Sequence, residues 1–206
     1  MTLQTAADGR STAPRWCELP DDFRPQEFRI QWASGPWMDA QARALRRQVF
    51  CVEQGLFRSV GGDDTDATDH DNPSTRTLVA LSCWGGQPDE VLGTVRIHAA
   101  APGLWWGSRL AVRADWRHSG KLGTALIRLA VRSAHALGCN EFLAHVQAQH
   151  LPLFQHLHWQ LLDMVDLHGR PHGLMRADLA QYPVCSKPFE GLVLAPGDGR
   201  KDPRHG

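Results

Sequence analysis

The segment from residue 110 to residue 126 combines cationic side chains with glycines in a way that suits the binding of an anion. An apolar run, typical of a buried strand, leads into a turn that carries Arg117 and Lys121, and a long helical pattern follows. The first backbone N–H groups of a helix have no intrahelical partner and lie at the positive end of the helix dipole. Gly120 and Gly123 would let an anion approach these groups without a Cβ atom in the way. The pattern therefore predicts a site for a phosphate or pyrophosphate.

The same turn also fits a plain strand-to-helix connection in which the glycines only serve packing. It matches neither the G-x-G-x-x-G fingerprint of dinucleotide-binding folds nor the G-x-x-x-x-G-K-[ST] loop of nucleoside triphosphatases. Taken alone, the turn leaves both interpretations open.

The elements around this turn predict a mixed sheet with helices on its faces. From 120 to 137, apolar and small residues recur at three- and four-residue spacing, and Gly138 provides a typical helix end. Two β-rich runs flank the turn 85–88 and predict an antiparallel hairpin. We expect strands at 28–32, 77–84, 91–99, 104–113, 142–146, 159–167 and 172–179, and helices at 40–55, 120–137 and 151–157. This order favours the α/β (α+β) class.

Length and composition predict one domain with two loose ends. The chain has 206 residues, of which 42% are hydrophobic, which suits a single core. Proline, glycine and polar residues dominate both ends, so we expect an N-terminal arm at 1–26, a domain at 27–183 and a flexible tail at 184–206. Basic and acidic residues number 22 each, which leaves no net charge to attract nucleic acid or an anionic membrane.

The chain carries no signal for export or for a membrane. No apolar run reaches the roughly 18–20 residues that a membrane-spanning helix needs. The first 20 residues lack the basic segment and apolar core of a signal peptide. The five cysteines are scattered and form no C-x-x-C pair, which favours reduced thiols. We therefore expect a cytoplasmic protein.

Several segments resemble the GNAT N-acetyltransferase superfamily, in the order that this family has. The run 110–112, then Arg117-x-x-Gly120 and a helix start at Gly123, is similar to motif A, the loop that binds the pyrophosphate of coenzyme A in this family. Further segments are similar to the first helix, to the second and third strands, and to a Tyr-x-x-Leu-Gly-Phe segment: 44–55, 78–97 and 154–159. The resemblance covers residues 28–180.

The resemblance implies a GNAT-like domain that transfers an acyl group from a coenzyme A thioester directly to an amine. Acetyl-CoA is the expected donor and a small-molecule amine the expected acceptor, with no metal; members are often homodimers. A backbone N–H of the strand before motif A would stabilise the oxyanion, and the splayed strands there would admit the pantetheine arm. The implied coenzyme A site consists of Leu110, Ala111, Val112, Arg117, His118, Ser119, Gly120, Lys121, Leu122, Gly123 and Thr124.

Two departures from the family pattern bear on the mechanism. The loop from Arg117 to Gly123 is one residue longer than the usual form, so Lys121 or Leu122 occupies a place that often holds glycine. Phe154 stands where many members have the tyrosine that protonates the coenzyme A thiolate. Because phenylalanine has no such proton, this role must be absent or moved, and His150 is our candidate for it.

The general base is not obvious, because the strand region 103–112 contains no acidic residue. Glu53, on the first helix, is the first candidate, followed by His70 and His98. Each also has a simpler explanation. Glu53 fits a solvated carboxylate, His70 a loop surface and His98 a partly buried strand residue.

We expect Trp105, His70 and His172 to contact the acceptor, with core packing of the tryptophan and surface exposure of His172 as the alternatives. The acidic run at 63–71 is either a solvated loop or a rim that attracts a cationic amine. It lacks the glycine and glutamate positions of an EF-hand. Histidines are frequent after residue 145, but they show no zinc-binding spacing, so we expect no metal.

Three alternatives stay open beside an N-acetyltransferase. The first is a non-catalytic acyl-CoA-binding or sensing module, which the missing strand acid and Phe154 favour. The second is an enzyme like the acyl-homoserine lactone synthases, which share the fold and also have an acidic loop before the second strand. The third is a metal-dependent structural protein.

Overall fold

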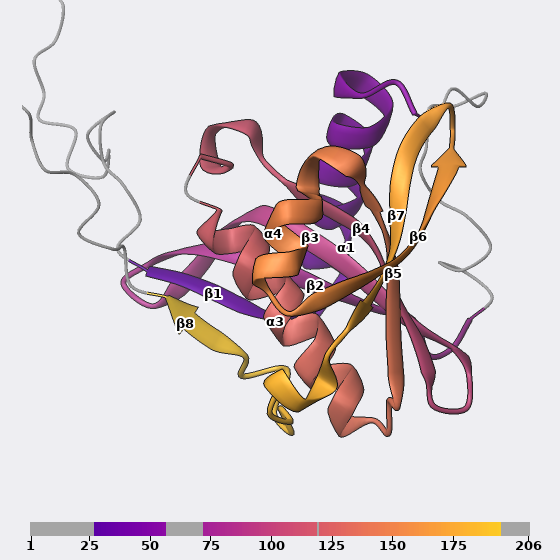
Figure 1. Cartoon of the computed structure of the whole chain (residues 1–206). Helices are drawn as coiled ribbons and strands as arrows, with labels where there is room; N and C mark the ends of the chain where they lie inside the picture. Colours follow the sequence, from indigo (N-terminus) through magenta and orange to yellow (C-terminus); the bar gives the residue numbers. More distant parts are fainter. Residues whose placement is uncertain (1–26, 57–71, 119, 195–206) are drawn as a thin grey trace, which may run out of the picture.

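The computed structural model describes residues 27–56, 72–118 and 120–194 (Figure 1). Four parts of the sequence predictions therefore lie outside the described residues: the arm at 1–26, the acidic run with His70, Ser119, and the end of the tail from residue 195.

The described elements follow the predicted order. They are β1 (Glu27–Trp32), α1 (Pro36–Arg46), the π-helical turn η1 (Arg47–Glu53), β2 (Arg76–Trp84), β3 (Gln87–Ala101), β4 (Leu104–Val112), the 3-10 turn η2 (Ala114–Trp116), α3 (Lys121–Ala136), β5 (Glu141–Gln147), the 3-10 turn η3 (Ala148–His150), α4 (Leu151–His156), β6 (Trp159–Leu167), β7 (Arg170–Ala177), the 3-10 turn η4 (Leu179–Gln181) and β8 (Leu192–Leu194). The predicted class, a mixed sheet flanked by helices, is confirmed.

The strands form one sheet in the order β6-β7-β5-β4-β3-β2-β1-β8. Helix α3 covers one face, where Leu126, Leu129 and Val131 have no exposed surface. Helix α1 covers the opposite face, where Met38 and Ala42 pack on strand residues of β2 and β3. Figure 1 shows these two layers, with α4 on the same side as α3. The apolar stripe read from the sequence thus becomes the core contact of α3.

The sheet changes character between β4 and β5. These two strands are parallel and pair only from Leu104 with Glu141 to Gly107 with Ala144. Beyond this point β4 continues along β3, and β5 continues along β7. We call this place the β4–β5 parting. Beyond it, the edges of β4 and β5 that face each other have no strand partner among the described elements, although both strands lie in the middle of the sheet.

A bulge in β4 lies directly after the parting. Thr94 and Arg96 of β3 are two residues apart, but their partners Ala111 and Ser108 are three residues apart. The extra residue is accommodated by Arg109, whose φ of 56° is unusual for a residue other than glycine. Such strained backbone is found where a strand must re-aim its groups, which is common beside functional sites.

Part of the segment that we expected to be a flexible tail belongs to the sheet. β8 pairs with β1, from Phe28 with Leu194 to Ile30 with Leu192. Gly191 precedes it with a φ of 64°, and a Cβ there would lie 1.8 Å from the carbonyl oxygen of Ile30. The short apolar run of β8 is surrounded by proline, glycine and charged residues, which hid it in the sequence pattern.

Candidate active site

The turn between β4 and α3 has the geometry predicted for an anion site. Gly120 adopts the left-handed conformation, with φ 63°, and caps the start of α3. The first helical hydrogen bond is donated by the N–H of Thr124 to the carbonyl of Gly120, at 3.0 Å. The N–H groups of Lys121, Leu122 and Gly123 precede that bond and lie in the first turn. They carry the positive end of the helix dipole.

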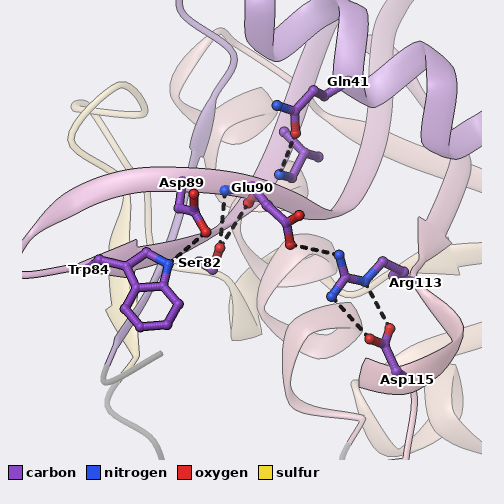
Figure 2. A network of polar contacts seen from close by, with 8 residues as sticks. Gln41, Ser82, Trp84, Asp89, Glu90, Arg113 and Asp115 are labelled. Carbon is purple, nitrogen blue, oxygen red and sulfur yellow. Dashed lines mark hydrogen bonds and ion pairs between the residues drawn. The ribbon is translucent and has the colours of Figure 1, made fainter. Parts of the chain in front are cut away.

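Arg113 fixes the beginning of this turn to the neighbouring hairpin, as Figure 2 shows. Its guanidinium binds both carboxylate oxygens of Asp115, at 2.9 and 3.0 Å, and one oxygen of Glu90, at 2.7 Å. The hydrogen bond to Asp115 is the largest cause that raises the pKa of Arg113, with Glu90 contributing. Two carboxylates thus neutralise this cation, so it positions the turn.

The same network extends to α1 (Figure 2). The pairing of β2 with β3 shifts register on both sides of Val91. The N–H of Val91 donates a hydrogen bond to the side-chain oxygen of Gln41 on α1, at 2.9 Å. Ser82 accepts a hydrogen bond from the N–H of Glu90, at 3.1 Å. Side chains from α1 and β2 therefore satisfy backbone N–H groups in a bulged part of β3. The sequence pattern gave no signal for this network.

Arg117 connects the turn to the end of η1. Its Nε donates to the carbonyl oxygen of Val112, at 2.6 Å, and its Nη2 lies 2.7 Å from a carboxylate oxygen of Glu53. The two residues were predicted separately, as a pyrophosphate ligand and as the general base. The structure brings them together, and it leaves Glu53 outside the lining of the neighbouring cavity.

A cavity of about 270 Å³ opens at the β4–β5 parting. Toward α3 and α4 its wall is apolar and is formed by Val95, Ile127, Ala130, Phe142, Val146, Phe154 and Trp159. The remaining wall carries most of the polar groups, among them Gln54, His98, Arg109, His145, Gln147, His150, His168 and His172. Among the described residues that line it, none is an aspartate or a glutamate. The available proton acceptors there are imidazoles.

Four of the lining residues lie in a row on one face of the sheet. His98 of β3 is the partner of Trp106 on β4, and the Trp106 ring lies 4.9 Å from the ring of His145 on β5. His172 of β7 is the partner of Gln147, two residues after His145 on the same face. We call His98, His145 and His172 the imidazole row. It faces away from α3, whose contacts on β5 are made by the alternate residues.

Hydrogen bonds tie η1 to the far side of the cavity. Gln147 of β5 donates to the side-chain oxygen of Gln54, at 2.9 Å. Arg170, at the start of β7, donates to the backbone carbonyl of Gln54, at 2.8 Å. The Arg170 carbonyl lies 2.9 Å from Nδ1 of His172. The end of η1, the end of β5 and the β6–β7 turn thereby form one connected rim.

The pKa values of two histidines that line the cavity are shifted. Partial burial, and then the neighbouring His172, lower the pKa of His145 below its usual value. Partial burial, and then the charge of Arg117, lower the pKa of His150. Both effects penalise the charged imidazolium, so the neutral forms predominate at neutral pH.

The outcome for the remaining predicted residues is mixed. His98, Leu110, His150 and His172 line the cavity, whereas Trp105 does not. Trp105 is buried in the core on the α3 side because neighbouring strand residues point to opposite faces, and Trp106 takes the place expected for it. Phe154 is buried, with its ring 5.1 Å from that of Trp159.

The sequence analysis did not select Arg109, His145, Gln54 or Gln147 as site residues. His145 could have been found, because strand alternation places it on the face opposite the apolar residues of β5. The other three depend on the β4 bulge and on the π-helical end of η1, which no local pattern indicates. Within the described ranges, no group of three or more His, Cys, Asp or Glu side chains is arranged to hold a metal ion. None of the described helices is both long and apolar enough to cross a membrane.

A splayed parallel pair of strands, with the first of them leading into a long helix, is the arrangement that the sequence resemblance implies. Residues 26–159 match the sequence profile of the acetyltransferase (GNAT) family, and this chain belongs to that family. Its members are acyltransferases that use acyl-CoA. A comparison with curated proteins found no match.

Solved structures with the same fold include enzymes of different specificity. A protein from Lactobacillus plantarum assigned as an N-acetyltransferase is 24% identical, with a TM-score of 0.63 over 74% of this chain and 98% of that chain. FeeM, an N-acyl amino acid synthase from uncultured soil microbes, is 14% identical, with a TM-score of 0.60 over 77% and 95%. The coenzyme A-dependent acyl-homoserine lactone synthase BjaI is 19% identical, with a TM-score of 0.58 over 74% and 83%. At these identities the similarity concerns the fold.

Proposed function

We propose that this protein transfers an acetyl group from acetyl-CoA to the amine of a small molecule by direct attack. The observation that carries this proposal is the position of the cavity at the β4–β5 parting. The cavity offers the imidazole row as proton acceptors, and the start of α3, which follows β4 along the chain, would offer the anion site.

The first turn of α3 would bind the pyrophosphate of coenzyme A. The N–H groups of 121–123 supply the donors, and Gly120 and Gly123 present no side chain to the approaching phosphates. Lys121 and Arg117 supply charge, with the Arg117–Glu53 pair holding that guanidinium next to the end of β4. The flanking positions of the proposed site are His118, Ser119, Leu122 and Thr124.

The thioester would lie in the parting, with its carbonyl oxygen against β4. Leu110 lies within the bulge, between the paired residues Ser108 and Ala111, and we propose that its backbone N–H stabilises the developing oxyanion. Leu110 lines the cavity, and Ala111 and Val112 continue the strand toward the pyrophosphate end. The pantetheine arm would follow this stretch of strand.

The coenzyme A thiolate must be protonated when it leaves. Phe154 cannot provide it, so we propose His150, which lines the same cavity. Because the pKa of His150 is lowered, its protonated fraction is small at neutral pH. The proton must then be resupplied from water at the open end of the cavity.

The amine would approach from the side of the imidazole row, where Trp106, His98 and His172 border the cavity. Glu53 is paired with Arg117 and lies outside this lining, which favours a positioning role over that of the base. We further propose a cytoplasmic enzyme that acts as a homodimer, on the basis of its scattered cysteines and of its family.

The experiment is an acetyl-CoA-dependent thiol-release assay with separate panels of amino acids, aliphatic amines and polyamines. We expect one panel to stimulate thiol release by wild type and to yield the N-acetyl product by mass spectrometry. Coenzyme A binding without turnover in every panel would instead support a non-catalytic acyl-CoA-binding module.

The apolar wall of the cavity favours a second candidate, transfer of an acyl group longer than acetyl. This activity would be comparable to that of acyl-homoserine lactone synthases. The same assay with acyl donors from acetyl to octanoyl, and with S-adenosylmethionine as acceptor, decides between them. Turnover of octanoyl-CoA with S-adenosylmethionine, and none of acetyl-CoA with any amine, would replace the first candidate by the second.

A further inference from the structure

The bases that surround the parting are all imidazoles, within the part of the chain that the structure describes. An amine is protonated near neutral pH and must lose a proton before or during attack on a thioester. The proposed function therefore requires a proton acceptor, and the inference below rests on that function.

The position of the thioester restricts the choice among the imidazoles. A general base must come within about 2.6–3.2 Å of the proton it removes, or reach it through one water. The parting is bordered by β4 and β5 alone, and His145 is the lining imidazole on a bordering strand. His98 on β3 and His172 on β7 are each one strand further away. His150 lies toward the charge of Arg117 and is already assigned the proton for the leaving thiolate.

The His145 ring is held in place without being buried. It packs against the ring of Trp106, with centroids 4.9 Å apart and 35° between the planes. The titratable or charged groups that line the same cavity from neighbouring elements are His98, Arg109, His150, His168 and His172. The nearest acid on its own strand and face is Glu141, which lies 3.8 Å from Arg176 near the other end of β5. The surroundings therefore favour an uncharged His145.

We propose that His145 is the general base of the acyl transfer. A ring nitrogen of His145 accepts a proton from the protonated amine, and the lone pair set free forms the C–N bond with the thioester carbon. The C–S bond then breaks, its electron pair leaves on the coenzyme A sulfur, and that sulfur takes up a proton as the nitrogen loses its second one. His145 releases its proton to solvent, so the products are the amide, the free thiol and one proton.

His172, on the adjacent strand β7, is held by the Arg170 carbonyl and lies on the same face of the sheet as His145. Its Nδ1 must carry a proton, because the Arg170 carbonyl oxygen 2.9 Å away can only accept a hydrogen bond. His172 is 7% exposed, and it is the second cause of the lowered pKa of His145, after partial burial. A lowered pKa keeps His145 unprotonated, and hence able to accept a proton, down to slightly acidic pH.

The test compares His145→Gln with wild type, using acetyl-CoA and the amine that wild type acetylates best. Glutamine keeps a polar side chain but cannot act as a base near neutral pH. We expect kcat to fall about 100-fold, in the range typical of general bases, with unchanged acetyl-CoA affinity. The acid limb of the wild-type kcat/KM profile, expected below pH 6.5, should be lost in the variant. His156→Gln, on the exposed surface of α4 and outside the cavity lining, is the matched control.

Rescue of activity by added imidazole distinguishes a general base from a residue that only packs against Trp106. His145→Ala should regain at least part of its activity when imidazole is added, and Trp106→Ala should not. If His145→Gln retains wild-type kcat and the acid limb, His145 is not the base, even though the transferase assignment stands. If wild type acetylates no amine, the proposed function itself fails, which is a distinct result.

Discussion

The two ends of the β4–β5 parting use opposite electrostatic arrangements. At the turn before α3, each of two arginines is matched by carboxylates: Arg113 by Asp115 and Glu90, and Arg117 by Glu53. In the cavity, imidazoles and Arg109 line the wall with no carboxylate among the described lining residues. The turn is thus built as a frame of ion pairs, whereas the cavity wall carries imidazole rings, which can accept or donate protons.

This difference indicates separate roles for the turn and for the cavity. Paired arginines hold the backbone of the turn, and the proposed function assigns pyrophosphate binding to the N–H groups at the start of α3, which do not titrate. An imidazole costs little to leave uncharged beside apolar walls and can exchange protons. Substitutions at the turn should therefore change donor affinity, and substitutions in the cavity should change turnover.

The largest effect should come from Trp106→Ala in the cavity. Removing the indole frees His145 from its packing partner and displaces it from the parting. Because small misplacements of catalytic groups are costly, we expect kcat/KM for the acceptor to fall about 100-fold. Acetyl-CoA affinity, measured by calorimetry, should stay at the wild-type value. A parallel loss of donor affinity would contradict the separation of the two ends.

Gly123→Ala, at the turn, should change protein stability and acetyl-CoA affinity in opposite directions. A Cβ here would meet only Val112, at an ordinary contact distance of 3.9 Å, and alanine is a better helix residue than glycine. We expect the free energy of unfolding to rise by about 0.5–1 kcal/mol. Acetyl-CoA affinity should fall about tenfold, equivalent to about 1.4 kcal/mol, because the methyl group faces the incoming phosphate. Unchanged affinity would mean that the pyrophosphate binds elsewhere.

Glu53→Gln distinguishes a positioning residue from a base. Loss of one ion pair near the surface should cost at most about 1 kcal/mol of stability. With Arg117 no longer held by Glu53, we expect acetyl-CoA affinity to fall slightly and kcat to remain close to wild type. A large fall in kcat at neutral pH, with donor affinity intact, would make Glu53 the base and not His145.

Arg113→Gln should have the smallest effect. Its charge is already neutralised by Asp115 and Glu90, so little charge is withdrawn from an incoming pyrophosphate. We expect the free energy of unfolding to fall by about 1 kcal/mol or less, since the pairs are partly exposed, and donor affinity to fall only slightly, because Arg113 positions the turn. Urea unfolding and calorimetry on the same preparation check both values.

The sequence predicted the parts of the molecule that depend on local patterns. The order of the elements, the helix after Gly120 and the cationic turn followed from apolar spacing and glycine positions, and the structure has them. β8 was missed because three apolar residues are too short a run to stand out. Its stability as a strand depends on β1, which is distant in sequence.

The cavity was only partly predictable, for a physical reason. Which of Trp105 and Trp106 faces the cavity depends on the register of β4, and a shift of one residue reverses every side chain. The bulge at Arg109 and the π-helical end of η1 arise from packing between distant segments. The imidazole row needs β3, β5 and β7 in their observed order, which the sequence pattern did not define.

The most direct test of the account is calorimetric titration of acetyl-CoA into wild type, Gly120→Asn and Gly120→Glu. Asparagine tolerates the left-handed conformation of residue 120, so Gly120→Asn controls for backbone strain, while glutamate also places a negative charge at the anion site. The account predicts micromolar-range binding by wild type, weaker binding by Gly120→Asn, and none by a folded Gly120→Glu. Wild type that is folded but binds no acetyl-CoA, or equal binding by all three proteins, would contradict it.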